Sequence, residues 1–194
     1  MIKTDFKDFI GTYKASDELC DKIIHYYNTN KHLAAPGSLY SVDGKNQSID
    51  KTQKESTDLS ISATHIYYPM DEYDKHLQES LNEYMKTYED VNFHNRFSIV
   101  EHYNIQHYPI GGGFKRWHFE ASSNATKSRL LVFMTYLNDV DDGGTMFKYQ
   151  NITIPAKKGL TLIWPSAFTH THKGQISQTK EKYIVTGWWS LLNE

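Results

Sequence analysis

From residue 97 onward the hydrophobic pattern has a period of two, and this feature most constrains the fold. Short runs rich in Val, Ile, Thr, Tyr and Trp are separated by Gly, Pro, Asn and Asp, which is typical of strands joined by turns. The predicted strands are Phe97–Tyr108, Trp117–Glu120, Arg129–Leu137, Met146–Tyr149, Ile152–Ile154, Leu160–Trp164, His170–Lys173 and Lys182–Leu191. The predicted turns are Gly111–Gly113, Asp141–Gly144 and Pro155–Gly159. This spacing indicates a sandwich, a barrel or a jelly roll.

The first half of the chain predicts two helices instead. Ser16 or Asp17 can cap the first, and Asp71 begins the second. Their apolar residues recur every three or four positions: Leu19, Ile23, Ile24 and Tyr27, then Tyr73, Leu77, Leu81, Tyr84, Met85 and Tyr88. Polar residues 41–58 predict a mobile loop, either a lid over a site or a plain surface loop.

The chain has the length of one domain and contains no linker or internal repeat that would divide it. We therefore expect a single domain over residues 1–194. We expect residues 1–96 to form a helical support region with a flexible loop at 41–58, and residues 97–194 to form the β core. The predicted fold class is mainly β (α+β).

Composition argues against several classes of function. The formal net charge is −2 and the basic residues are scattered, so we expect no nucleic-acid partner. No apolar run reaches membrane-spanning length, and the first residues lack the pattern of a secretory signal. Cys20 is the single cysteine, which favours a reducing compartment. We expect a cytoplasmic protein without a membrane partner.

One short motif combines an imidazole and a carboxylate. His118 and Glu120 are two positions apart, so on a strand both side chains leave the same face. Either His170 or His172 could supply a third ligand. Two imidazoles and one carboxylate leave coordination positions open, as Fe(II) oxygenases require, whereas a structural zinc site would close all positions, usually with Cys.

A lysine near the end of the chain supports this interpretation. Lys182 opens the apolar run up to Trp189, where an inward-facing charge is costly unless it meets an anion. On a regular strand, Lys182, Ile184, Thr186 and Trp188 share one face. The lysine could therefore bind the distal carboxylate of a keto acid, or it could be a solvated residue at the start of a strand.

With these residues assembled, the C-terminal half resembles the prolyl-4-hydroxylase-like branch of the 2-oxoglutarate/Fe(II)-dependent dioxygenases, in versions that bacteria and phages encode. The resemblance covers about residues 97–190, with its landmarks in family order. They are Ile105-Gln-His-Tyr108, Gly111-Gly-Gly-Phe-Lys-Arg-Trp-His-Phe-Glu120, Tyr136-Leu-Asn-Asp139, Gly143-Gly-Thr-Met-Phe147, Pro155-Ala-Lys-Lys-Gly159, His172-Lys-Gly174 and Lys182-Tyr-Ile-Val-Thr-Gly-Trp188.

This resemblance implies a double-stranded β-helix, or jelly roll, with the metal inside one end and supporting helices outside. It selects His172 as the third ligand, because the family's second metal histidine stands ten places before the co-substrate lysine. It further implies that Lys182, Tyr108 and Thr145 hold 2-oxoglutarate and that Trp188 lines the inner wall. From the residues alone, the last three could equally be a core tyrosine, a turn threonine and a core tryptophan.

Three further positions bear on specificity. Arg129 matches an arginine near the substrate entrance of family members, although a salt bridge at the rim would explain it equally well. Most prolyl hydroxylases have Asp where this chain has Glu120. Glutamate retains the ionised oxygen ligand, so iron binding is expected. The carboxylate also argues against a halogenase, because a halogenase needs that ligand position for chloride. Ser190 stands where some peptidyl-prolyl hydroxylases have a substrate-facing histidine, which weakens the analogy for peptide binding.

The predicted function is thus a 2-oxoglutarate- and Fe(II)-dependent dioxygenase that forms succinate and CO₂ while hydroxylating a prolyl residue of a peptide or protein. O₂ is the oxidant, and ascorbate could serve as an accessory reductant. A free amino acid or other small metabolite is the alternative substrate. A catalytically inactive jelly-roll binding module and a hydrolytic zinc enzyme are alternatives of other classes. The expected location is the cytoplasm of a bacterium, or of the host cell of a phage. No motif indicates an oligomeric state.

Overall fold

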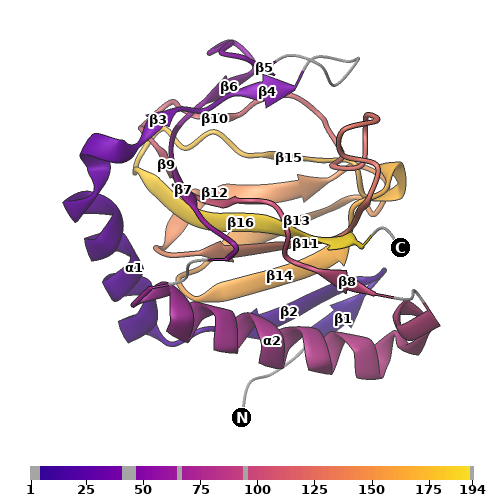
Figure 1. The fold of residues 1–194 in the computed structure, drawn as a ribbon. Coiled ribbons are helices and arrows are strands. Elements are labelled where there is room, and N and C mark those ends of the chain that lie inside the picture. The colour runs from indigo at the N-terminus through magenta and orange to yellow at the C-terminus, as the bar shows by residue number, and fades with distance from the viewer. Residues whose placement is uncertain (1–4, 41–46, 65–66, 94–95, 193–194) are drawn as a thin grey trace.

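The computed structural model describes residues 5–40, 47–64, 67–93 and 96–192 (Figure 1). Its largest sheet is antiparallel and has the strand order β1-β2-β14-β11-β16-β9-β7-β3, with β8 beside β16. These strands are β1 (Asp5–Lys7), β2 (Ile10–Lys14), β14 (Leu160–Pro165), β11 (Arg129–Tyr136), β16 (Lys182–Leu191), β9 (Tyr103–Tyr108), β7 (Thr57–Ile61), β3 (Ala35–Pro36) and β8 (Phe97–Ser98). Strands from the first half of the chain therefore extend the sheet on both sides.

A second antiparallel sheet has the order β13-β12-β15. Its strands are β13 (Ile152–Ala156), β12 (Val140–Phe147) and β15 (His172–Gly174). Two small antiparallel pairs lie beyond β15 in Figure 1. They are β10 (Gly113–Phe114) with β6 (Lys54–Glu55), and β4 (Leu39–Tyr40) with β5 (Gln47–Ser48). The two larger sheets form the layers that position the site.

Strand β11 contributes alternate side chains to two separate hydrophobic clusters. Leu131 and Phe133 belong to the hydrophobic cluster that also contains the helix side chains. Val132 and Met134 belong to a second cluster, which includes Phe147 of the smaller sheet. Successive side chains leave a strand on opposite faces, so the large sheet packs against the helices on one face and the small sheet on the other.

The two predicted helices are confirmed as α1 (Asp17–Thr29) and α2 (Met70–Thr87), and both cover the outside of the large sheet (Figure 1). Ser16 caps α1 by accepting a hydrogen bond from the Leu19 amide. The predicted apolar faces supply most of the helices' buried side chains, including Leu19, Ile23, Tyr27, Tyr73, Leu77, Leu81 and Tyr84. Short 3₁₀ segments are η1 (Lys31–Leu33), η2 (Glu89–Phe93) and η3 (Phe168–His170). No described helix is both long and apolar enough to cross a bilayer.

Several predicted strand boundaries were wrong. The predicted strand Trp117–Glu120 pairs only through an isolated bridge between His118 and His172, because the Glu120 and Ala121 amides both turn to the Ser166 carbonyl. The predicted strand His170–Lys173 is divided, since His170 ends η3 and β15 begins at His172. Residues 99–102 separate β8 from β9 in the same way.

The predicted turn Asp141–Gly144 lies within β12, where the register against β13 shifts between Val140 and Thr145. A side chain at Gly144 would come within 2.4 Å of the Ile154 carbonyl, so glycine permits this close strand contact rather than a turn.

The polar stretch predicted as a loop also contains short strands. Gln47–Ser48 and Lys54–Glu55 form β5 and β6, and β7 begins at Thr57. Residues 41–46 lie outside the described residues.

Candidate active site

A pocket of about 770 Å³ opens on the inner face of the large sheet. Its walls come from β9, β11 and β16 of that sheet, from β12 and β15 of the smaller sheet, and from β6 and β7. All eight residues that the sequence proposed for a site line it: Tyr108, His118, Glu120, Arg129, Thr145, His172, Lys182 and Trp188. The fold therefore brings together residues that span 81 positions of the chain, from Tyr108 to Trp188.

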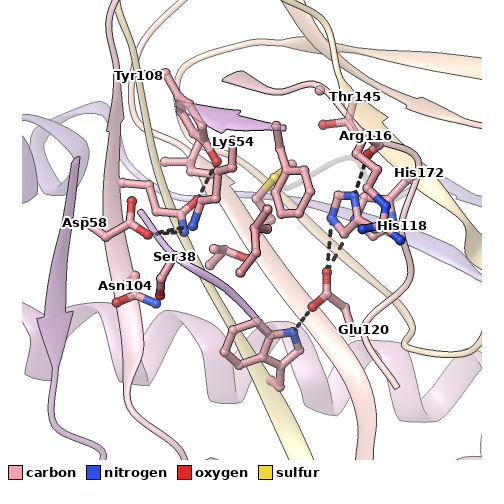
Figure 2. Close-up of a pocket in the computed structure, with 18 of the residues that line it drawn as sticks. Ser38, Lys54, Asp58, Asn104, Tyr108, Arg116, His118, Glu120, Thr145 and His172 are labelled. Atoms are coloured by element: carbon pink, nitrogen blue, oxygen red, sulfur yellow. Dashed lines mark hydrogen bonds and ion pairs between the residues drawn. The ribbon is translucent and has the colours of Figure 1, made fainter. Parts of the chain in front are cut away.

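His118, Glu120 and His172 converge at one end of this pocket (Figure 2). One potential ligand atom from each residue lies within 4.8 Å of the others. Glu120 Oε1 is 3.4 Å from His118 Nε2 and 3.6 Å from His172 Nε2. The single bridge between His118 and His172 aligns the two backbones, so a motif outside any regular strand still meets a residue of β15.

Hydrogen bonds define which imidazole nitrogen each histidine presents. His118 Nδ1 lies 2.9 Å from the Arg116 carbonyl, and His172 Nδ1 lies 2.8 Å from the His170 carbonyl. A carbonyl only accepts, so both Nδ1 atoms donate and a neutral ring presents the lone pair of Nε2. Two such lone pairs and a carboxylate oxygen then face one another. This donor set fits a divalent cation. In known metal sites, too, the second ring nitrogen of a ligand histidine commonly donates to a backbone carbonyl, which orients the ring.

The charges of the group suit a metal site as well. Burial alone would raise the pKa of Glu120, but hydrogen bonds and charge from His118 and His172 hold that pKa well below its ordinary value. Burial lowers the pKa of His172, and the neighbouring His118 lowers it further. At neutral pH the group therefore offers an ionised carboxylate and an uncharged His172 imidazole, which are the forms that bind metal.

Aromatic neighbours fix the two imidazole rings. The His118 ring stacks on Phe114, with centroids 3.6 Å apart and an interplanar angle of 9°. The His172 ring meets Trp164 edge-on at 5.0 Å and lies 5.7 Å from Phe147. Both ligand rings are thus held by packing as well as by hydrogen bonds.

Lys182 lies in the same pocket, at the start of β16, and is 5% exposed. Its Nζ donates to the carbonyls of Gly143 at 2.7 Å and Gln175 at 3.1 Å. Among the described residues, no carboxylate oxygen lies within 4.0 Å of it. Burial lowers the pKa of Lys182 to about 8. An ammonium group has three donors, so one remains for an anion in the pocket.

Tyr108 lies beside this lysine, and Thr145 lines the same pocket. Tyr108 is opposite Lys182 in the β9–β16 register, and its ring centroid is 5.4 Å from Lys182 Nζ. The Thr145 hydroxyl hydrogen-bonds to the Tyr136 hydroxyl, and Tyr136 also lines the pocket. This cluster of hydroxyl groups and one ammonium group has the chemistry of a carboxylate-binding site.

Trp188 and Arg129 lie near Glu120 rather than at the lysine. The Trp188 indole N–H donates to Glu120 Oε2 at 2.9 Å, and Arg129 lies against the Trp188 ring. Arg129 also forms the salt bridge considered from the sequence, with Glu101 as its partner at 2.6 Å. His170 is directed elsewhere, because its Nε2 lies 2.9 Å from the Asp8 carbonyl.

Sequence reasoning missed a polar network on the opposite side of the pocket (Figure 2). Lys54 and Asp58 form a buried ion pair at 2.7 Å, with side-chain exposures of 7% and 12%. Gln106 donates to Asp58 and accepts from the Tyr108 hydroxyl. The only signal in the sequence was a polar run, which is also the pattern of a solvated loop.

Residues 103–190 match the family model of the 2OG-Fe(II) oxygenase superfamily. This segment of the chain is therefore similar to a 2OG-Fe(II) oxygenase domain. The predicted likeness to prolyl hydroxylases is confirmed. The protein is a 2-oxoglutarate- and Fe(II)-dependent dioxygenase, with Fe(II), 2-oxoglutarate and O₂ as its cofactors. This assignment favours the oxygenase over the inactive binding module and the zinc hydrolase. No curated protein is similar enough in sequence to be matched.

Solved structures with a similar fold include three prolyl hydroxylases. The viral collagen prolyl hydroxylase of Paramecium bursaria Chlorella virus-1, in its 2OG complex, has 18% identity and a TM-score of 0.69, covering 95% of this chain and 97% of that one. A Pseudomonas putida prolyl-4-hydroxylase has 13% identity, a TM-score of 0.70 and coverage of 95% and 94%. A Trichoplax adhaerens prolyl hydroxylase, bound to a hypoxia inducible factor peptide, has 15% identity, a TM-score of 0.67 and coverage of 95% and 84%. The predicted double-stranded β-helix is confirmed.

Proposed function

We propose that this dioxygenase hydroxylates its substrate at an iron held by His118, Glu120 and His172. The observation that carries the proposal is the convergence of two Nε2 lone pairs on one carboxylate oxygen. The same pocket contains the buried Lys182, which pairs with no carboxylate of the described residues. The three side chains leave coordination positions open. Lys182, Tyr108 and Thr145 would bind the distal carboxylate of 2-oxoglutarate.

When bound, Fe(II) and 2-oxoglutarate supply the chemistry by which O₂ converts a substrate C–H group to C–OH, while the keto acid loses CO₂ and becomes succinate. The protein's own part is orientation and exclusion of water. The carbonyls of Arg116 and His170 keep the imidazole rings in the ligating tautomer. Lys182 would neutralise the distal carboxylate of a bound 2-oxoglutarate, and the walls of the pocket would shield the reacting atoms from solvent.

A prolyl residue of a peptide or protein is the first candidate substrate. The three similar structures above are prolyl hydroxylases, and one of them holds a peptide. The pocket of this chain also opens beside Trp117 and Phe119, whose rings could contact a pyrrolidine ring.

A free amino acid or other small polar metabolite is the second candidate, and the Lys54–Asp58 pair favours it. The wall opposite the ligand triad presents an ammonium and a carboxylate side by side, with Asn104 nearby (Figure 2). Gln106 also lines the pocket and donates to the carboxylate of Asp58. A zwitterion offers the complementary pair of charges, whereas the backbone of a peptide does not.

Succinate release from 2-oxoglutarate, measured over a panel of proline-containing peptides and free amino acids, tests the proposal. Mass spectrometry of each substrate should show the gain of one oxygen atom. Hydroxylation confined to peptides would select the first candidate, and hydroxylation confined to free amino acids would select the second. If neither set gained oxygen while 2-oxoglutarate and Fe(II) bound normally, both substrate classes would be wrong.

A further inference from the structure

The two carboxylate oxygens of Glu120 have different partners. Oε1 faces the imidazoles, at 3.4 Å from His118 and 3.6 Å from His172. Oε2 accepts from the Trp188 indole N–H at 2.9 Å and from Arg129 Nη1 at 3.4 Å. Figure 2 shows the carboxylate lying between the imidazoles and an indole ring. One oxygen thus faces the two imidazoles that would bind a metal with it, and the other accepts hydrogen bonds from Trp188 and Arg129.

Arg129 is itself held rigidly. Its Nε and Nη2 bond to both oxygens of Glu101, at 3.0 Å and 2.6 Å. Its guanidinium carbon lies 3.5 Å from the centroid of Trp188, and its side chain is 6% exposed. Ser190, which pairs with Arg129 in the β11–β16 register, donates to Glu101 as well. A planar guanidinium held by stacking and by a two-point carboxylate contact has little freedom to move.

The arrangement matters because the predicted metal ligand is a glutamate rather than an aspartate. A carboxylate can bind a metal through one oxygen or through both. The side chain of glutamate is one methylene longer than that of aspartate, so Glu120 has more freedom to turn its second oxygen toward the ion. Two-oxygen binding would take a coordination position that the co-substrate or O₂ needs.

We propose that Trp188 and Arg129 are positioning residues that keep Glu120 a one-oxygen metal ligand. They act by occupying Oε2, and Glu101 acts through Arg129. This inference rests on the proposed iron site. It gives Arg129 a buried role at the ligand, in place of the substrate contact that the resemblance implies.

The test measures 2-oxoglutarate binding to the Fe(II)-loaded protein under anaerobic conditions. Calorimetry gives the affinity, and the visible metal-to-ligand charge-transfer band reports on the coordination of the metal. Trp188→Phe removes the indole N–H but keeps a ring beneath Arg129. We expect its 2-oxoglutarate affinity to fall about tenfold, with a shifted band. Its Fe(II) affinity without 2-oxoglutarate should change less than about threefold, because all three ligands remain. Glu101→Gln should shift both readouts in the same direction by a smaller factor.

Trp189→Phe is the matched control, because Trp189 neighbours Trp188 but packs in the helix-facing core and does not line the pocket. It should leave 2-oxoglutarate affinity unchanged. Unchanged 2-oxoglutarate affinity in both Trp188→Phe and Glu101→Gln would overturn the inference. The inference would also be overturned if Trp188→Phe lost enough Fe(II) affinity to account for its entire loss of 2-oxoglutarate affinity. If Trp188→Phe fails to fold, Glu101→Gln alone decides between these results.

Glu120→Asp separates positioning from a direct contact between Trp188 and 2-oxoglutarate. The shorter aspartate cannot place its second oxygen at the indole, so Trp188→Phe should have little further effect in the Glu120→Asp protein. An equal loss in both backgrounds would show direct contact and contradict the inference. The wild-type protein distinguishes the two levels of proposal: if it forms no charge-transfer band, the iron site itself is wrong, whereas a normal wild-type band with unaffected variants refutes only the positioning role.

Discussion

The segments around Lys182 and around Lys54 each place a buried lysine in the pocket, but the two lysines have different partners. Lys54 Nζ lies 2.7 Å from the carboxylate of Asp58. Among the residues that the structure describes, the hydrogen-bond partners of Lys182 Nζ are the carbonyls of Gly143 and Gln175. The two residues are almost equally buried, at 6% and 5% exposure. The charge of Lys54 is therefore compensated by Asp58, whereas no carboxylate of the described residues compensates that of Lys182.

This difference separates a structural charge from a binding charge. Burying an ammonium without a counter-ion costs free energy, so such a group is expected where a ligand supplies the missing charge. Lys182 meets this condition, since one of its donors remains for an anion. Lys54 joins β6 to β7 through Asp58, so its first role is to hold that wall of the pocket in place.

Replacing Lys182 should give the largest effect on the co-substrate. Lys182→Met keeps an apolar stem but removes the ammonium, so we expect 2-oxoglutarate affinity to fall by at least about 100-fold with Fe(II) affinity retained. Calorimetry under anaerobic conditions measures both. Lys54→Met should leave 2-oxoglutarate affinity within about threefold of the wild type. Equal losses in the two variants would abolish the distinction between the lysines.

Replacing Lys54 should act on stability instead. Lys54→Met leaves Asp58 buried without its cation, although Ser56 and Gln106 still donate to it. We expect the free energy of unfolding, from urea denaturation, to fall by about 2 kcal/mol. The matched control is Lys115→Met, whose pair with Glu55 is about one-third exposed and should contribute less than about 0.5 kcal/mol. A Lys54→Met protein as stable as this control would show that the buried pair has no structural role.

The pH dependence of 2-oxoglutarate binding should also show whether the Lys182 ammonium is the binding group. Burial lowers its pKa from 10.5 to about 8, so the folded protein without ligand loses this proton at lower pH than the unfolded chain. Stability should therefore rise with pH between about 8 and 10.5, while 2-oxoglutarate affinity falls because its cation is lost. One pH unit above the pKa, the affinity should be about tenfold weaker. Lys182→Arg, if it still binds, should remove this dependence, since arginine stays charged. A flat wild-type profile would mean that the ammonium is not the binding group.

Tyr108 should give the smallest effect of the series. Its hydroxyl donates to Gln106 at 2.6 Å in the structure and would have to turn toward a bound carboxylate. Tyr108→Phe should therefore weaken 2-oxoglutarate binding by about fivefold, the value of one ordinary hydrogen bond. Calorimetry checks this, with Tyr183→Phe as the control, because the Tyr183 hydroxyl bonds to Glu181 and the residue does not line the pocket. A loss as large as that of Lys182→Met would place the main carboxylate contact at the tyrosine.

The same contrast explains what the sequence could predict. Lys182 was identifiable because it opens an apolar run on a regular strand, where period-two reasoning places it on the pocket face. Lys54 lies in a polar run, where nothing in the local pattern distinguishes a buried lysine from a solvated one. Its burial arises from pairing between β6 and β10, some 60 residues apart in sequence.

The sequence predicted which residues line the candidate site, but it did not predict which of them contact one another. His118 and Glu120 were placed on a strand that the structure does not form, yet the Ser166 carbonyl and the bridge to His172 still direct both side chains into the pocket. The contact of Arg129 with Glu101 joins residues 28 positions apart, and that of Trp188 with Glu120 joins residues 68 positions apart. Such contacts depend on how strands pack, and local spacing carries no information on that.

The most direct test of the iron site is anaerobic titration of the Fe(II)-loaded protein with 2-oxoglutarate, monitored by the visible charge-transfer band. We expect a saturable band in the wild type and in His170→Ala, because His170 bonds to the Asp8 carbonyl away from the triad. We expect no band in His118→Ala or His172→Ala. A band that survives in His172→Ala but disappears in His170→Ala, or one that is absent from the wild type, would contradict the proposed site.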